Sequence, residues 1–283
     1  MADTTHVVLD DAWPGGVLGL PELDAREWGP RLRYVAPRAL VDRFARTVAP
    51  RLAPFVLYGS GDFHYLSGVF VRRAAAGAGP LTLVSFDNHP DWDVRPPYWS
   101  CGGWAARASR DERVAKVSVW GCGNFELRFP ARTFADRRAL RAVGLEVHAW
   151  AERQPPSVRS RFDCMSREDW HARFERFAAS LAGTGVYVTV DMDCLAADEA
   201  ATNWENGLFT AADVAWAIET LRAHASVVAG DVCGAWSEPR YERHGQRFAG
   251  RWDHPKLAPP DPARASDLNV RALETIWPAL VAA

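Results

Sequence analysis

The chain has 283 residues, 48% of them hydrophobic and 24% charged, which is the balance of a globular protein with enough apolar side chains for a core. A formal net charge of −2 and the absence of basic runs exclude a typical nucleic-acid-binding protein. No stretch approaches ~20 consecutive apolar residues, no secretory signal is recognisable, and five dispersed cysteines form no C-x-x-C pair. We therefore expect a cytoplasmic protein that neither crosses a membrane nor depends on disulfides.

Short apolar runs rich in β-branched residues alternate with longer amphipathic segments along the chain. The apolar runs predict strands at residues 54–58, 81–86, 117–120, 145–149, 186–190 and 227–229. The amphipathic segments predict helices at residues 39–48, 104–109, 134–143, 167–182, 211–224 and 265–277, with Pro278 ending the last one. This alternation predicts an α/β fold with a mostly parallel sheet and helices on both faces, and nothing resembling a linker divides residues 1–283, so we expect a single domain.

Two segments, residues 154–161 and 237–262, have the composition of loops. The second contains proline, glycine and histidine, and it is unusually long for a structureless connection; such loops commonly have a function. We expect it to serve as a lid or as an oligomer contact. His244 and His254 become relevant if the segment closes over a site.

Three of the predicted strands end in polar residues of a similar kind. The strand at 54–58 runs into GSGDFH, the strand at 81–86 into DNHPD, and the strand at 186–190 into DMD. Ligands bind beyond the carboxyl ends of the strands in a parallel sheet. Because alternate side chains of an extended chain point the same way, Asp87, His89 and Asp91 can converge, as can Asp191 and Asp193.

Four aspartates gathered at one place repel one another unless cations neutralise them. Carboxylate-rich ligation with one or two imidazoles suits Mn²⁺ and also accommodates Fe²⁺, Co²⁺, Ni²⁺ or Zn²⁺. Four carboxylates with two histidines exceed the needs of one ion, so the sequence favours two divalent cations bridged by shared aspartates. A single D-x-H-x-D motif is equally consistent with a hydrogen-bonded turn, and only the combination of the three motifs makes the metal site the better interpretation.

These motifs, in this order, resemble those of the ureohydrolase (arginase/agmatinase) family. That family carries a G-G-D-H turn, then D-A-H-x-D, then S-x-D-x-D and a loop that ends in G-G-L-T; this chain has GSGDFH, DNHPD, TVDMDCL and GLFT. The resemblance extends over roughly residues 54–240. It implies the three-layer α/β/α fold of arginases and deacetylases and a binuclear manganese site.

Carried over position by position, the resemblance implies that one metal is held by His64, Asp87, Asp91 and Asp191. The second metal is completed by His89 and Asp193, with Asp87 and Asp191 bridging the two. The implied reaction is metal-assisted hydrolysis, in which a hydroxide between the cations attacks a planar carbon such as that of a guanidinium. Asp91 is by analogy the residue that relays a proton to the leaving amine.

The chain also departs from the family pattern. Phe63 separates Asp62 from His64, and the segment after DNHPD, residues 97–104, lacks the histidine that assists proton transfer in arginases. Within this segment Trp99 and Cys101 are candidate substrate contacts, and a buried structural thiol explains Cys101 equally well.

The family's guanidinium-binding glutamate, in an E-x-N-P stretch, aligns with Gly234 in this chain. Asp231 and Glu238 are the candidates to substitute for it. His148 is a further candidate acid, base or substrate contact, and the alternative is a hydrogen-bonded structural histidine.

The loop after the DMD motif, residues 196–207, also differs from its family counterpart. It offers Asn203, Trp204 and Glu205 as candidate substrate-binding residues. Trp236 lies close to another motif and adds to the aromatic wall that these tryptophans would form around a substrate.

The leading hypothesis is therefore a binuclear metallohydrolase that acts on a guanidino or related C–N bond and releases urea or an analogue. The altered recognition loops favour a small guanidino compound other than free arginine, or an arginine-containing peptide, as the substrate. Two alternatives stay open: a zinc-type deacetylase or amide hydrolase of the same fold, whose usual H-H pair is missing here, and a catalytically inactive metal-binding protein. A homo-oligomer is compatible with the resemblance, although the sequence shows no interface signature.

Overall fold

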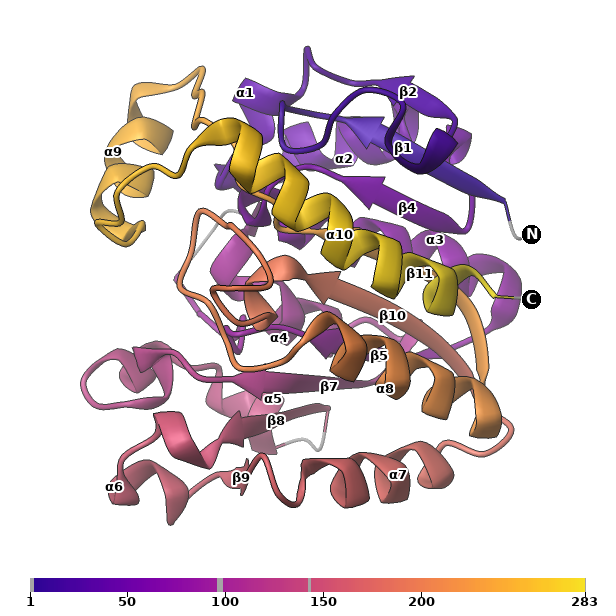
Figure 1. Ribbon diagram of the computed structural model, residues 1–283, viewed down its shortest axis with the longest axis vertical. Coiled ribbons are helices and arrows are strands. Elements are labelled where there is room, and N and C mark those ends of the chain that lie inside the picture. The colour runs from indigo at the N-terminus through magenta and orange to yellow at the C-terminus, as the bar shows by residue number, and fades with distance from the viewer. Residues whose placement is uncertain (1–2, 96–98, 142–143, 283) are drawn as a thin grey trace.

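The computed structural model describes residues 3–95, 99–141 and 144–282, and a nine-stranded parallel sheet runs through them (Figure 1). The strands, in spatial order, are β2 (Glu22–Asp24), β1 (Thr4–Val8), β4 (Phe55–Tyr58), β11 (Ser226–Cys233), β10 (Gly185–Asp191), β5 (Leu81–Phe86), β7 (Val114–Cys122), β8 (Leu145–Trp150) and β9 (Asp163–Met165). Every neighbouring pair in this sheet is parallel. The predicted parallel sheet is confirmed.

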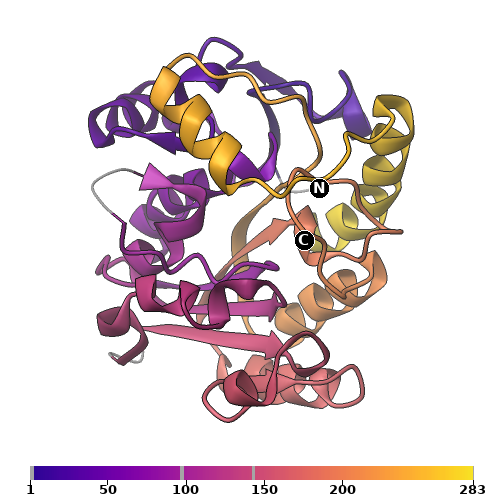
Figure 2. The same cartoon turned by 90° about the vertical axis from the view of Figure 1, so that its left-hand side faces the viewer.

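Helices cover both faces of the sheet, and each face has its own apolar core. One layer contains α2 (Arg38–Thr47), α3 (Ser67–Ala78), α4 (Trp104–Ala108) and α5 (Arg137–Arg141). The opposite layer contains α7 (Trp170–Ser180), α8 (Ala211–His224) and α10 (Pro262–Val281). Figure 2 shows the two helical layers on either side of the strands, which confirms the three-layer α/β/α fold.

The predicted strands are all present, and β5 and α8 agree with their predicted limits at both ends. The strands that the sequence did not reveal are β1, β2, β9 and a separate antiparallel pair formed by β3 (Val35–Ala36) and β6 (Trp99–Ser100), and the four-residue helix α1 (Gly29–Leu32) was missed as well. Apart from the five-residue β1, these strands have two or three residues, too few positions for a recognisable alternation.

Two segments predicted as loops contain helices: α6 (Pro156–Arg159) and α9 (His244–Asp253). The helix α3 was not predicted either. Its Gly68 weakens the helical pattern, and packing is the reason for this glycine, because a Cβ there would lie 2.9 Å from the ring of Trp99.

The prediction that Pro278 ends the last helix is wrong, since α10 continues through it to Val281. Burial and a hydrogen bond stabilise the final turn. Leu280 is fully buried, and Arg222 Nε donates to the carbonyl of Ala279 at 2.9 Å. The helix predicted at 134–143 is shorter and begins at Arg137; its last two predicted residues lie outside the described part of the chain. Among the described residues, no helix combines the length and apolarity that crossing a bilayer requires.

Candidate metal centre and its cavity

The three polar motifs meet at one edge of the sheet, beyond the carboxyl ends of β4, β10 and β5. β4 leads into a short 3₁₀ turn, Gly61–Leu66, that carries His64. Asp87 and Asp91 follow β5, while Asp191 is the last residue of β10 and Asp193 lies in the next turn. In the sheet β10 is paired with β5, and β11 alone separates it from β4, so parallel pairing brings these ends together.

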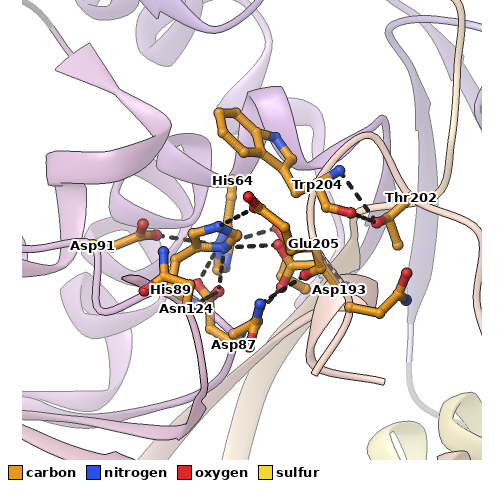
Figure 3. A network of polar contacts seen from close by, with 12 residues as sticks. His64, Asp87, His89, Asp91, Asn124, Asp193, Thr202, Trp204 and Glu205 are labelled. Carbon is orange, nitrogen blue, oxygen red and sulfur yellow. Dashed lines mark hydrogen bonds and ion pairs between the residues drawn. The ribbon is translucent and has the colours of Figure 1, made fainter. Parts of the chain in front are cut away.

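A first cluster surrounds His64, whose ring nitrogen Nδ1 faces three carboxylates. It lies 3.1 Å from Asp87 Oδ2, 3.5 Å from Asp91 Oδ2 and 3.4 Å from Asp191 Oδ2. All four side chains are buried. His64, Asp87 and Asp91 are close enough to ligate one cation together (Figure 3), and Asp191 forms a further such group with His64 and Cys233. His64, Asp87, Asp91 and Asp191 are called the first cluster below.

A second cluster surrounds His89, again through Nδ1. This atom lies 2.9 Å from Asp193 Oδ2 and 3.5 Å from Asp87 Oδ1. Asp87 therefore presents one carboxylate oxygen to each histidine, and it lies between the two clusters (Figure 3). A shared carboxylate in this position is what a pair of cations a few ångströms apart requires.

The charges of this site fit divalent cations. Burial and the neighbouring Asp193 raise the pKa of Asp191 to about 8, and burial raises the pKa of Asp193 to about 6. The pKa of Asp91 also lies well above its ordinary range, because of burial and the nearby Asp87. Asp87 Oδ2 is buried and makes no hydrogen bond among the described residues. Two divalent cations would relieve this repulsion, and the oxygen-rich donor set with two imidazoles suits them.

Behind His64, a buried hydrogen-bond chain orients the imidazole. His64 Nε2 lies 2.9 Å from Thr189 Oγ1, and the Thr189 hydroxyl donates to Asp231 Oδ1 at 2.6 Å. Because the Thr189 hydroxyl donates its hydrogen bond to Asp231, its oxygen accepts a hydrogen bond from Nε2–H of His64, and the lone pair of Nδ1 is left to face the carboxylates. The chain therefore selects the tautomer in which His64 can bind a cation.

Two further contacts support the ligand set. The indole nitrogen of Trp104 donates to Asp91 Oδ2, and the Trp104 ring packs edge-on against His64 with centroids 4.8 Å apart. On the other side, His89 Nε2 lies 3.5 Å from Glu205 Oε2. Asp91 itself has a φ of 47°, a left-handed conformation that aspartate tolerates better than most residues and that tight contacts must hold.

A cavity of about 520 Å³ opens over both clusters. Its floor consists of the cluster residues, and its walls include Tyr34, Cys101, Glu126 and Trp204. The Trp204 ring stacks near Tyr34 with centroids 6.3 Å apart and meets His89 edge-on at 5.4 Å. Residues of α9 also line the cavity, so the predicted lid segment does lie over the site.

Of the predicted substrate residues, Cys101 and Trp204 line the cavity, and Glu205 contacts His89 from the side. Trp99 is instead buried in the core, where Arg72 lies over its ring at 4.6 Å. Asp231 is fully buried behind His64, where it accepts hydrogen bonds from Thr189, Ser67 and Tyr187.

The remaining candidates lie away from the cavity. Asn203 and Trp236 line a separate surface hollow, and Asn203 Nδ2 donates to the carbonyl of Ser237 at 2.8 Å. Glu238 is exposed at the edge of that hollow. His148 stacks on Trp120 with centroids 3.8 Å apart, and its Nδ1 lies 2.9 Å from Asp163 Oδ2. The structure thus does not bring His148 or Glu238 to the two clusters on the floor of the cavity.

Several cavity residues were not singled out from the sequence, among them Tyr34, Glu126, Arg243 and Asp253. Glu126 follows β7, which pairs with β5, so the rule that ligands bind at strand ends could have found it. Tyr34, Arg243 and Asp253 lie in segments without a motif. Only the tertiary fold brings these three to the site.

Solved structures of arginases and of an amidino hydrolase share this fold. Arginase from Bacillus caldovelox superposes with a TM-score of 0.59 at 14% identity, over 100% of this chain and 99% of that one. Proclavaminate amidino hydrolase from Streptomyces clavuligerus superposes with a TM-score of 0.56 at 14% identity, over 99% of this chain and 91% of that one.

A hypothetical agmatinase from Burkholderia thailandensis matches at 20% identity with a TM-score of 0.49. The match covers 84% of this chain and 64% of that one. No protein-family model matches the chain, and no curated protein matches its sequence.

Proposed function

We propose that the chain is a ureohydrolase that cleaves a guanidino C–N bond at a binuclear metal site and releases urea or an analogue. The observation that carries the proposal is the pair of clusters that share Asp87, in a chain with the arginase fold. In this assignment His64, Asp91 and Asp191 hold one cation with Asp87. His89 and Asp193 hold the other, and Mn²⁺ best suits such carboxylate-rich ligation.

Two bound cations would lower the pKa of a water between them and so provide hydroxide near neutral pH. The chain's own residues would position the substrate and move protons. Trp204 and Tyr34 form an aromatic wall beside His89 that suits a planar cation. Asp91 is the carboxylate we assign to proton relay, with its Oδ2 held in place by the indole of Trp104.

The substrate that we propose is a guanidino compound other than free arginine, because the loop at residues 196–207 lacks the family's sequence for recognising free arginine. The family's guanidinium-binding carboxylate corresponds to Gly234 here, and a Cβ on Gly234 would lie 2.1 Å from Asp191 Oδ1. No side chain fits at that position, so the guanidinium must be bound by other groups. A different guanidino compound, either a small molecule or an arginine-containing peptide, is the better candidate.

The deacetylase alternative is less well supported. Deacetylases of this fold use paired histidines as acid and base beside the metal, and the sequence has no H-H pair. Among the described residues that line the cavity, the histidines are His64 and His89, and each already faces carboxylates through Nδ1. Neither is left for proton transfer.

The test is metal content and urea release by the manganese-loaded protein with a panel of guanidino compounds and arginine-containing peptides. We expect close to two cations per chain and urea or an ornithine-type product from at least one compound. Asp191→Asn should lose at least one cation and the activity, while Asp198→Asn, an exposed aspartate after β10, should change neither. Two bound cations without any hydrolysis would refute the guanidine assignment and favour the inactive metal-binding alternative, and a stably folded protein that binds none would refute the metal site itself.

A further inference from the structure

A buried thiol lies beside the first cluster. Cys233 is the last residue of β11, and the strand pairing places it directly opposite Asp191, the last residue of β10. Its sulfur lies 3.7 Å from Asp191 Oδ2, the same oxygen that lies 3.4 Å from His64 Nδ1. Of the five cysteines, all of which the structure describes, Cys233 alone joins a group of three potential metal ligands.

The spacing of these three donor atoms is that of ligands on one cation. Bonds of about 2.0–2.3 Å from a tetrahedral cation to nitrogen, oxygen and sulfur separate neighbouring donors by about 3.3–3.8 Å. The two separations that involve Asp191 Oδ2 fall within this range, and all three donor atoms lie within 4.8 Å of one another. A thiol that merely donates a hydrogen bond to Asp191 explains one of these contacts, whereas a shared cation explains all of them.

The backbone fixes the sulfur and the carboxylate in this arrangement. Gly234 follows Cys233 with a φ of 103°, and a Cβ on Gly234 would lie 2.1 Å from Asp191 Oδ1, so only glycine lets β11 end so close to Asp191. Asp191 Oδ1 accepts from the Asp193 amide at 3.1 Å. This hydrogen bond leaves Oδ2 of Asp191 to face His64 and Cys233.

A second buried oxygen points to a cation at the same place. Asp87 Oδ2 lies 3.1 Å from His64 Nδ1, and it makes no hydrogen bond among the described residues. A cation among these donors would satisfy that oxygen and would bind the sulfur of Cys233 as a thiolate, since a thiol that binds a metal gives up its proton. Sulfur is a softer ligand than a carboxylate oxygen and favours Zn²⁺ over Mn²⁺.

We propose that Cys233 is a further ligand of the cation held by the first cluster, and that it makes this half of the site selective for Zn²⁺. The second cluster offers only oxygen and nitrogen donors, so it should discriminate less between Zn²⁺ and Mn²⁺. As the metal–sulfur bond forms, the thiol proton passes to solvent. The inference rests on the binuclear site of the proposed function and states which ion one half of that site selects.

Cobalt replaces zinc in the first experiment, because Co²⁺ bound to a thiolate shows a charge-transfer absorption in the near ultraviolet. Titration of the chelator-treated protein with Co²⁺ should produce this absorption with one of two equivalents. Cys233→Ser should lose it. Cys101→Ser, at the cavity wall, and Cys122→Ser, a matched control at the buried end of β7, should keep it.

The variant should also lose metal selectivity. In Cys233→Ser the ratio of Co²⁺ to Mn²⁺ affinity at this site should fall at least about tenfold, since even residues that only support a ligand change metal affinity about 10- to 100-fold. Zinc X-ray absorption on the wild type is an independent measurement that does not require the variant to fold. One sulfur neighbour at about 2.3 Å for every two zinc ions would support the ligand. Two bound ions with no sulfur neighbour would overturn it, and so would a charge-transfer absorption that persists in folded Cys233→Ser.

Failure of this inference can be told from failure of the proposed function. Urea release by a protein whose zinc ions have no sulfur neighbour would overturn the Cys233 ligand and leave the function standing. A thiolate absorption that depends on Cys233, without urea from any guanidino compound, would support the ligand and refute the function. A folded protein that binds no cation would overturn both.

Discussion

His254 Nε2 lies 2.6 Å from Asp62 Oδ1 and so joins the segment after α9 to the turn that carries His64. The other oxygen of Asp62 accepts from Arg33 Nε at 2.7 Å. Although burial raises the pKa of Asp62, His254 and Arg33 together lower it to about 2, so this carboxylate is ionised at neutral pH. The preceding residue, Asp253, accepts a hydrogen bond from the Tyr34 hydroxyl. These hydrogen bonds hold the C-terminal end of α9 at the rim of the cavity.

Replacing His254 by alanine should loosen α9 over the cavity. The variant loses a hydrogen bond to a charged group, and the lost stabilisation corresponds to about tenfold faster amide exchange in residues 244–254. Hydrogen exchange followed by mass spectrometry measures this, with Phe248→Ala as the control, because Phe248 lies on the same helix and is exposed. Equal exchange in both variants would show that the contact does not hold the helix.

Trp104→Phe should weaken one of the two cation sites selectively. The phenylalanine ring keeps apolar packing against His64 but removes the indole donor from Asp91 Oδ2. Both contacted residues belong to the first cluster, so we expect about tenfold weaker Mn²⁺ affinity at one site and no change at the other. Calorimetric titration measures this, with the buried Trp99→Phe as the matched control. Equal loss at both sites would point to a general disturbance of the fold instead.

The sequence predicted those parts of the site that depend on spacing along one strand end. Asp87, His89 and Asp91 lie within five residues, and Asp191 and Asp193 lie within three, so local chain geometry suffices to bring each group together. The parallel sheet then brings the groups to one edge. Periodicity revealed this sheet because its central strands are buried on both sides and are nearly continuous apolar runs.

Two features of the site could not be predicted from the sequence. One is the layer into which a strand residue points, and the other is which distant segments line the cavity. Asp231 in β11 was expected to face the substrate, but its side chain points into the layer of α3, where Ser67 donates to it. His148 in β8 points into the opposite layer, against Trp120 and Phe177. Alternation along a strand tells which residues share a face, and only the packed fold decides what that face meets.

His148 therefore leads to a prediction about stability rather than catalysis. Burial lowers its pKa, but the carboxylates of Asp163 and Glu146 outweigh burial, and the pKa in the folded protein lies above the ordinary 6.5. Protonated His148 thus stabilises the fold. This contribution is fully present below pH ~6.5 and is lost as the pH rises through the raised value.

His148→Gln should accordingly lower the melting temperature below pH 6.5 by ~2–4 °C, since a partly exposed ion pair contributes at most about 1 kcal/mol. The difference from wild type should shrink as the pH rises to 9, because His148 in the wild type then loses its charge. Thermal scans across pH measure this, with His224→Gln as a control, since His224 is exposed and makes no ion pair with the described residues. A difference that is constant with pH would mean that packing on Trp120, and not charge, is the contribution of His148. A large fall in kcat without loss of stability would instead indicate that His148 takes part in catalysis.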